Sequence, residues 1–250
     1  MTPRKAATPT AGRRAPAKVD GGKGALEPAR RATGAKRAAP KGGQASPVPL
    51  RVGVLMVQGA AGEHVDAVRR AAERAGREVE VVPVRTAAQL EACSGLVIPG
   101  GESTTISRLL RSGGLQAPLV ERARSGDLAL FGTCAGLILL CSDATRDVAD
   151  KDIELLGLLD CRVDRNAFGR QRDSFEARLD VEGVGSVPAV FIRAPKVVEA
   201  RAPTEVLARF GDGVVAVRKG RILGTAFHPE LTQDTRLHEW FLRLCEKPDA

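Results

Sequence analysis

The sequence predicts an α/β fold in which a mostly parallel central sheet carries helices on both faces, giving three layers. Nearly continuous apolar runs, such as residues 51–57 (RVGVLMV), are typical of parallel strands that are covered on both sides. These runs alternate with segments of helical periodicity, as in βαβ units. No apolar run approaches the roughly 18 residues that a bilayer-spanning helix needs, so a membrane protein is excluded.

The first half of the chain is expected to hold the parallel strands. Its first helix shows Val65, Val68 and Ala72 at helical spacing and ends at Gly76. Further expected strands and helices alternate from there to Cys141. The expected strands are 51–57, 79–84, 95–98 and 128–131, and the expected helices are 63–75, 87–91, 104–111, 115–125 and 137–141.

After Gly157 the pattern changes to short strands in which apolar and polar residues alternate. The expected strands are 159–163, 175–181, 189–192, 206–210, 214–218 and 222–227, and a helix at 232–245 closes the chain. In open α/β sheets, ligands bind where strands end and helices begin. The loops at those points are therefore the candidates for a functional site.

The net positive charge of the chain comes from its first 50 residues. The whole sequence has 38 Lys and Arg against 30 Asp and Glu, and residues 1–50 hold 11 of the former and 2 of the latter. The remainder is close to neutral, so a basic folded surface for nucleic acid is not supported, whereas a basic appendage is.

Residues 1–49 form a tail that is rich in Ala, Pro and Gly and contains no aromatic residue. Such a segment cannot bury enough apolar surface to offset the entropy of ordering it, so we expect disorder there and one domain at 50–250. A solvated extension without function is the simplest interpretation of the tail. An electrostatic tether to polyanions and an organelle transit peptide stay open, whereas the lack of an apolar segment excludes a secretory signal.

The chain has five cysteines, an odd number without C-x-x-C spacing. This pattern favours neither a disulfide framework nor a zinc site, so no metal is expected. Free thiols fit a reducing compartment, which indicates a cytoplasmic protein.

The turn Gly132-Thr133-Cys134-Ala135-Gly136 is the candidate nucleophile site. It is the cysteine counterpart of the G-x-S-x-G elbow, in which a tight strand-to-helix turn lifts the side chain out of the sheet. The helix N-terminus at this point favours the thiolate form of Cys134. Taken alone, the motif is equally consistent with a small buried cysteine in a glycine-rich turn.

His228 is the histidine best placed to serve such a thiol. It follows the expected strand 222–227 and precedes Pro229 and Glu230, which is close enough to orient the imidazole. H-P-E alone is a turn sequence, but together with the cysteine turn it predicts a Cys-His-Glu triad. His64, at the start of the first helix, and His238, inside the last, are interpreted as surface or packing residues.

Residues 99–105 (PGGESTT) follow the third expected strand and precede a helix. They lack the Lys of a phosphate-binding loop and the spacing of a dinucleotide site, so they do not predict nucleotide binding. A backbone N–H from the adjacent glycines, together with that of Ala135, would form an oxyanion hole. Two later loops, 165–171 and 191–195, contain arginines that could hold a substrate carboxylate, although spacing alone favours plain surface loops.

The combination of motifs resembles the glutaminase subunit of pyridoxal 5′-phosphate synthase, a class I glutamine amidotransferase with a flavodoxin-like fold. The resemblance runs from about residue 50 to the end of the chain. The cysteine turn and H-P-E belong to the whole amidotransferase class. The more specific segments are GGESTT at 100–105, RNAFGRQRDSFE at 165–176, FIRAP at 191–195 and FHPEL at 227–231.

This resemblance implies that Cys134 is the nucleophile, His228 the acid/base and Glu230 its orienting residue. It also implies an oxyanion hole at Gly101 and Ala135. The L-glutamine-binding residues that it implies are Gly101, Glu102, Ser103, Arg165, Ile192 and Arg193.

The resemblance further implies hydrolysis of glutamine to glutamate and ammonia without a cofactor. The ammonia would pass to a synthase subunit, in a complex built on a twelve-subunit synthase core, and residues 58–60 match a loop near that interface. Two alternatives stay open: a non-catalytic scaffold subunit, and a glutaminase that serves a different synthase. The complete triad argues against the first, and the specific loops argue against the second.

Overall fold

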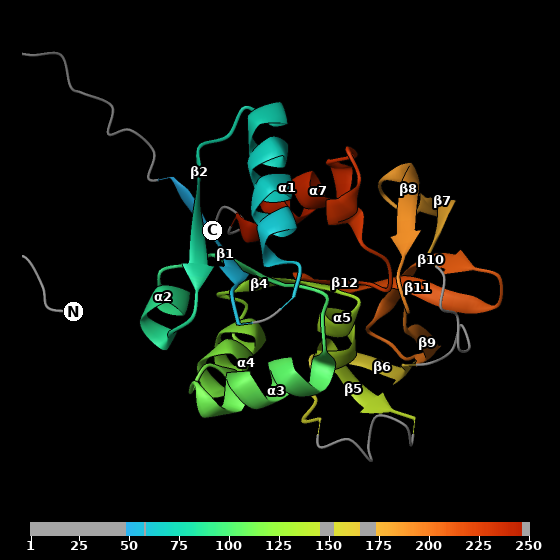
Figure 1. Cartoon of the computed structure of the whole chain (residues 1–250), viewed down its shortest axis with the longest axis horizontal. Coiled ribbons are helices and arrows are strands. Elements are labelled where there is room, and N and C mark those ends of the chain that lie inside the picture. The colour runs from blue at the N-terminus through green and yellow to red at the C-terminus, as the bar shows by residue number, and fades with distance from the viewer. Residues whose placement is uncertain (1–48, 58, 146–152, 166–173, 247–250) are drawn as a thin grey trace, which may run out of the picture. The chain divides into compact units, whose positions relative to one another are not determined.

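The computed structural model describes residues 49–57, 59–145, 153–165 and 174–246, which Figure 1 shows as coloured ribbon. All of them belong to one unit, Pro47–Ala250. The tail expected to be disordered lies almost wholly outside the described residues, as do Gln58 and most of the 165–176 segment.

Twelve strands are present in the described residues. They are β1 (Leu50–Leu55), β2 (Val79–Val84), β3 (Gly95–Ile98), β4 (Ala129–Thr133), β5 (Cys141–Ala144), β6 (Leu159–Asp164), β7 (Phe175–Val181), β8 (Gly185–Phe191), β9 (Lys196–Ala200), β10 (Glu205–Phe210), β11 (Gly213–Lys219) and β12 (Ile222–Thr225). One sheet has the order β2-β1-β3-β4-β12-β11-β9-β6-β5, with β10 also paired to β11, and β7 and β8 form a separate hairpin. The strands from β2 to β12 in this order run parallel.

Helices cover both faces of the parallel part of the sheet. They are α1 (Ala61–Arg74), α2 (Ala87–Glu91), α3 (Ser103–Ser112), α4 (Gln116–Arg124), α5 (Ala135–Leu140) and α7 (Arg236–Cys245), with a 3₁₀ turn, η1 (Pro229–Leu231). In Figure 1, α1 and α7 lie on one face, and α3, α4 and α5 lie on the other. The predicted three-layer α/β architecture is therefore confirmed. None of the helices within the described ranges combines the length and apolar character needed to cross a bilayer.

The parallel strands are buried, as the apolar runs predict. All four residues of β3 and all five of β4 are buried, because helices pack on both sides of these central strands. The carboxyl ends of β3, β4 and β12 lie together at one edge, since the three strands are adjacent and parallel. This edge is where the candidate site residues leave the sheet.

The structure differs from the predicted elements at Cys141. The expected helix 137–141 begins two residues earlier and ends at Leu140, while Cys141 begins β5, which pairs in parallel with β6. An extended backbone at Cys141 (ψ of 157°) ends the helix and gives the backbone a ladder partner in β6 instead. The sequence analysis also missed β9, whose short apolar pair stands between charged residues.

The last predicted helix, 232–245, starts later than expected. The 3₁₀ turn η1 takes up Pro229–Leu231, and α7 begins at Arg236. Asp234 accepts a hydrogen bond from the backbone N–H of Arg236 at 3.1 Å, which satisfies a free donor of the first turn and sets the start of α7.

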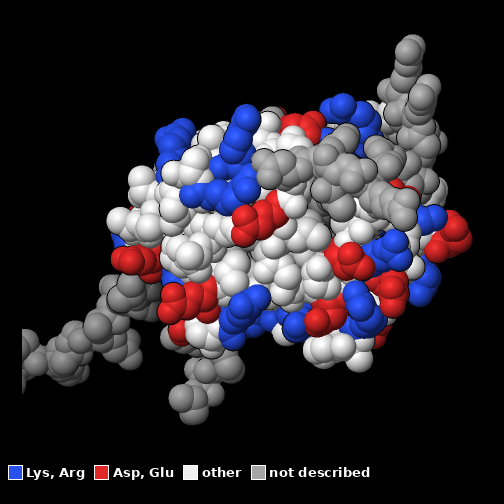
Figure 2. Space-filling model, turned by 90° about the horizontal axis from the view of Figure 1, so that it is seen from below, with Lys and Arg blue, Asp and Glu red and all other residues white. Residues whose placement is uncertain are grey.

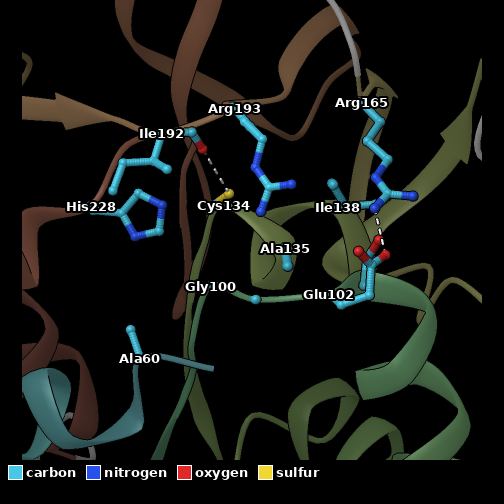
Figure 3. A pocket seen from close by; sticks show the side chains of 12 residues that line it. Ala60, Gly100, Glu102, Cys134, Ala135, Ile138, Arg165, Ile192, Arg193 and His228 are labelled. Carbon is cyan, nitrogen blue, oxygen red and sulfur yellow. Dashed lines mark hydrogen bonds and ion pairs between the residues drawn. The ribbon is translucent and has the colours of Figure 1, made fainter. Parts of the chain in front are cut away.

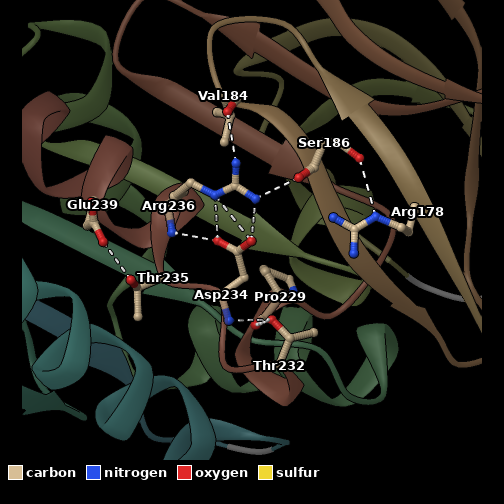
Figure 4. Close-up of polar contacts among 9 residues, drawn as sticks. All are labelled: Arg178, Val184, Ser186, Pro229, Thr232, Asp234, Thr235, Arg236 and Glu239. Carbon is tan, nitrogen blue, oxygen red and sulfur yellow. Dashed lines mark hydrogen bonds and ion pairs between the residues drawn. The ribbon is translucent and has the colours of Figure 1, made fainter.

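Arg236 also ties α7 to the β7–β8 hairpin (Figure 4). Its guanidinium forms an ion pair with Asp234, at 2.5 Å, and donates to the carbonyl oxygens of Val184 (3.3 Å) and Ser186 (2.6 Å). The hairpin in turn accepts a hydrogen bond from the backbone N–H of His228 through Val190, at 2.8 Å. These contacts fix the chain on both sides of the H-P-E segment.

Candidate active site

Cys134 occupies the turn between β4 and α5. Its backbone lies in the left-handed region, with φ of 49°, which is rare for a residue other than glycine and marks a strained position. Its N–H donates to the carbonyl oxygen of Thr225 on the neighbouring strand β12 at 2.8 Å, so the turn is tied to the sheet. The side chain is thereby placed at the first turn of α5, where the helix backbone presents free N–H groups.

The glycine at position 136 permits this turn. A Cβ atom there would lie 2.1 Å from the carbonyl oxygen of Ile98, at the end of β3. Only glycine therefore lets α5 approach the sheet closely enough for the cysteine to stand at the sheet edge. This is the close backbone approach that the G-x-C-x-G pattern predicts.

His228 and Glu230 meet beside the cysteine. His228 follows β12 and precedes η1, and its Nδ1 lies 2.7 Å from Oε1 of Glu230. Burial lowers the pKa of His228, but hydrogen bonding with Cys134 and with the Glu230 carboxylate outweighs it and raises that pKa to about 10. The imidazole is therefore held in its protonated form between a thiol and a carboxylate.

The backbone of Gly100 packs directly against this pair. A Cβ atom at Gly100 would lie 2.5 Å from Cε1 of His228 and 3.4 Å from Cβ of Cys134. The carbonyl oxygen of Gly100 accepts a hydrogen bond from the N–H of Ala60 at 3.3 Å, which connects the loop after β1 to the loop after β3.

A cavity of about 430 Å³ opens at this sheet edge (Figure 3). All the residues predicted to bind substrate or form the oxyanion hole line it, together with Cys134 and His228. Glu230 does not line it, because it lies behind His228. Ala60, Gly100 and Ile138 line the cavity without having been predicted to do so, although Gly100 belongs to the same G-G pair as Gly101.

Charged groups gather on one side of the cavity. Nη2 of Arg165 lies 2.5 Å from Oε1 of Glu102, which also accepts a hydrogen bond from Thr104 at 3.0 Å. Burial raises the pKa of Glu102, but the hydrogen bond from Thr104 and the Arg165 guanidinium together hold it below its usual range. The carboxylate is therefore ionised at neutral pH.

Further polar groups of the cavity wall lie near the thiol or are left without a partner. The Sγ of Cys134 lies 3.9 Å from the carbonyl oxygen of Ile192, and Arg193 follows with a left-handed φ of 43°. The Oγ of Ser103, which also lines the cavity, is buried and has no hydrogen-bond partner among the described residues. A buried hydroxyl that lines a cavity in this state is available to a ligand.

The other two histidines are packing residues, and neither is on the surface. His64 and His238 are both fully buried, with ring centroids 5.6 Å apart between α1 and α7. His64 also reaches the site, because its Nε2 lies 3.4 Å from Oε2 of Glu230. The sequence analysis missed this contact, since no local motif links residues so far apart along the chain.

The surface charge of the described residues is mixed. Figure 2, which views the molecule from below the orientation of Figure 1, shows Lys and Arg interspersed with Asp and Glu. Several charged side chains of the described residues are paired, for example Arg111 with Glu154 at 3.7 Å. This view agrees with the near-neutral charge of residues 51–250.

The strand-to-helix cysteine turn, the adjacent histidine–carboxylate pair and the cavity at the carboxyl ends of parallel strands are typical of cysteine hydrolases with an α/β fold. The comparisons with known proteins specify the class further. Residues 54–247 match the model of the SNO glutamine amidotransferase family. This chain belongs to that family and is thus a glutamine amidotransferase, an enzyme that acts on glutamine.

Several relatives are named pyridoxal 5′-phosphate synthase subunit PdxT. The protein from Methanosarcina acetivorans is 50% identical over 194 residues, which cover 77% of this chain and 97% of the relative. The protein from Thermococcus onnurineus is 52% identical over 196 residues, covering 78% and 98% respectively. A solved structure titled as a glutamine amidotransferase is 48% identical, covers 78% of this chain and 98% of its own, and has a TM-score of 0.69.

Proposed function

We propose that this chain hydrolyses L-glutamine to L-glutamate and ammonia through Cys134, His228 and Glu230, and supplies the ammonia to a synthase subunit that makes pyridoxal 5′-phosphate. The observation that carries the proposal is the position of His228, which contacts the thiol and the carboxylate at the wall of one cavity. Burying ionisable groups costs free energy, so packing alone would favour apolar side chains at these positions. The presence of all three therefore points to chemistry.

The first half of the reaction is acyl transfer to Cys134. The thiolate attacks the side-chain carbonyl carbon of glutamine, and a C–S bond forms while the carbonyl oxygen becomes an oxyanion. The N–H groups of Gly101 and Ala135 are assigned to this oxyanion, and each such donor is worth about 3–4 kcal/mol. When the C–N bond breaks, the His228 imidazolium protonates the departing nitrogen, which leaves as ammonia.

The second half is hydrolysis of the thioester. Neutral His228 takes a proton from water, and the resulting hydroxide attacks the thioester carbon. The tetrahedral species collapses with cleavage of the C–S bond, releasing glutamate and restoring the thiolate beside protonated His228. Glu230 keeps the Nδ1–H of His228 directed at itself, which leaves Nε2 for both proton transfers.

The cavity has groups that match free glutamine. A zwitterionic amino acid presents one carboxylate and one ammonium, and the cavity is lined by the guanidiniums of Arg165 and Arg193 and by the ionised Glu102. The unsatisfied hydroxyl of Ser103 offers a further polar contact. We assign the α-carboxylate to the arginines and the α-ammonium to Glu102.

The identity of the ammonia acceptor is proposed from the relatives, which are named as subunits of pyridoxal 5′-phosphate synthase. The assembly around a twelve-subunit synthase core is part of the same proposal. A cytoplasmic location is also included, because all five cysteines are free thiols.

The deciding experiment measures ammonia release from glutamine by the purified full chain, with and without a pyridoxal 5′-phosphate synthase core subunit. We expect low activity alone and a large rise with the core. The Cys134→Ala variant is the control: it should bind the core and release no ammonia. Binding to the core without ammonia release by the wild type would instead indicate a scaffold subunit. Activation by a different synthase core, and not by this one, would reassign the acceptor.

A further inference from the structure

The second oxygen of Glu230 faces a histidine that the reaction described above does not use. Oε1 of Glu230 contacts His228, whereas Oε2 is buried and has no hydrogen bond of standard geometry among the described residues. Nε2 of His64 lies 3.4 Å from Oε2, and both side chains are completely buried. A buried carboxylate oxygen needs a hydrogen-bond donor, and His64 is placed to provide one.

The surroundings of His64 determine which nitrogen bears its proton. Burial lowers the pKa of His64 well below its usual value, and the neighbouring His238 and His228 lower it further, so the ring is neutral and has one N–H. Nε2 faces both Oγ1 of Thr133, at 3.0 Å, and the Glu230 carboxylate. A lone pair directed at a carboxylate is repelled, whereas an N–H is attracted, so the negative charge favours the Nε2–H tautomer.

The other ring nitrogen agrees with this assignment. Nδ1 of His64 lies 3.4 Å from Nε2 of His238, which is also buried and neutral. If Nε2 of His238 bears the proton, it donates to Nδ1 of His64. The Nδ1 of His238, which has no partner among the described residues, is then a lone pair and not an unsatisfied N–H. The charged group nearby on α1, Arg70, further disfavours protonation of His238.

We propose that His64 is a positioning residue of the catalytic triad: its Nε2–H, shared between Oγ1 of Thr133 at 3.0 Å and Oε2 of Glu230 at 3.4 Å, attracts Oε2, so that Oε1 stays directed at Nδ1 of His228. This inference rests on the proposed glutaminase function. A carboxylate rotates readily about its last bond, so one hydrogen bond alone leaves its plane poorly defined. The His64 ring is itself fixed by edge contact with Phe131, at 6.4 Å between centroids.

The activity test compares two substitutions at this position in the full chain bound to its synthase core. His64→Gln keeps an N–H near the position of Nε2, and His64→Leu fills the space without a donor. We expect His64→Leu to lower kcat roughly 10- to 100-fold with KM unchanged, and His64→Gln to recover most of that loss. Val68→Ala, one turn along α1 on the same buried face, is the packing control: it should lower Tm and leave kcat unchanged.

A double-mutant cycle with Glu230→Gln separates positioning from structure. If His64 acts through Glu230, adding His64→Leu to Glu230→Gln should cost less than about twofold more. If the full loss in kcat recurs in that background, His64 does not act through Glu230 and the proposal fails. If the wild type releases ammonia and His64→Leu is as active as the wild type, the role proposed for His64 is wrong, while the glutaminase function stands.

A second measurement needs neither activity nor a variant. Long-range ¹H–¹⁵N correlation spectra of the wild-type chain report the tautomer of each histidine. We expect neutral His64 protonated on Nε2; protonation on Nδ1 would overturn the proposal, whatever the kinetics show. Absence of ammonia release by the wild type would count against the proposed function, and the spectrum would still decide the role of His64.

Discussion

Oε1 of Glu230 lies 2.7 Å from Nδ1 of His228, although only Pro229 separates the two residues in the chain. The 3₁₀ turn η1 begins at that proline and folds the carboxylate back onto the imidazole. Both side chains are buried, so their interaction is weakly screened by solvent. The pair therefore defines the protonation and the orientation of the imidazole at the same time.

Glu230→Gln should reduce the catalytic rate while keeping a side chain of similar size beside His228. The amide cannot stabilise the imidazolium as a carboxylate does, and it can present an N–H to Nδ1, which favours the wrong tautomer. We expect kcat for ammonia release to fall roughly 10²- to 10⁴-fold, with a smaller change in KM. Steady-state kinetics on the core-bound chain will measure this, and a variant as fast as the wild type would remove Glu230 from the triad.

The same substitution should flatten the pH dependence of stability. The pKa of His228 is raised to about 10 in the folded chain, against about 6.5 when unfolded, so its contribution is complete below pH 6.5 and is lost as pH rises toward 10. Urea unfolding between pH 6.5 and 10 should show a steeper decline in the free energy of unfolding for the wild type than for Glu230→Gln. Parallel declines would show that Glu230 does not raise this pKa.

Much of the fold could be predicted from local pattern. β2, α2, β3 and β7 have the bounds that the sequence predicts, because each is a short apolar or alternating segment that turn residues or polar residues bound clearly. β9 could not be found in this way, since its residues do not alternate and its pairing is with distant strands.

The candidate site also has parts that local motifs predict and a part that depends on tertiary packing. The cysteine turn and H-P-E are local motifs, and their meeting follows from β4 and β12 being adjacent and parallel. The contact between His64 and Glu230 depends on how α1 packs beside η1, which no spacing along the chain encodes. The sequence therefore predicted the triad and most of the residues that line the cavity, but not the buried contact between His64 and Glu230.

Gly100→Ala should reduce activity more than stability. The added Cβ would lie 2.5 Å from Cε1 of His228, so the imidazole must move away from the thiol. We expect a loss in kcat of roughly 100-fold, because a displacement of about 1 Å has that effect on aligned reacting groups. Gly62→Ala, in α1 with open space around the new Cβ, is the matched control and should keep full activity.

Arg236→Ala should loosen the β7–β8 hairpin. The guanidinium joins Asp234 to the carbonyl oxygens of Val184 and Ser186, and its partly exposed position limits the energy at stake (Figure 4). We expect a loss of about 1 kcal/mol in the free energy of unfolding and faster amide exchange in the hairpin. Arg69→Ala, which removes a loose exposed pair with Asp66 at 3.8 Å, should change stability by less than about 0.5 kcal/mol. Equal effects of the two substitutions would contradict this role.

Arg165→Ala tests whether the charged side of the cavity binds substrate. Arg165 lines the cavity and contacts Glu102 at 2.5 Å, and in Figure 3 its side chain points toward Glu102 and not toward Cys134, so its removal should weaken glutamine binding before it affects chemistry. We expect KM for glutamine to rise roughly 10- to 100-fold with kcat reduced less, as for loss of one charged hydrogen bond to a carboxylate.

The control is Arg162→Ala, on the preceding strand β6, where the arginine forms a loose pair with Asp143 at 3.8 Å. That variant should keep the wild-type KM, because its side chain does not line the cavity. An unchanged KM in Arg165→Ala would mean that Arg165 stabilises the loop through Glu102, and the α-carboxylate of glutamine would then be assigned to Arg193 alone.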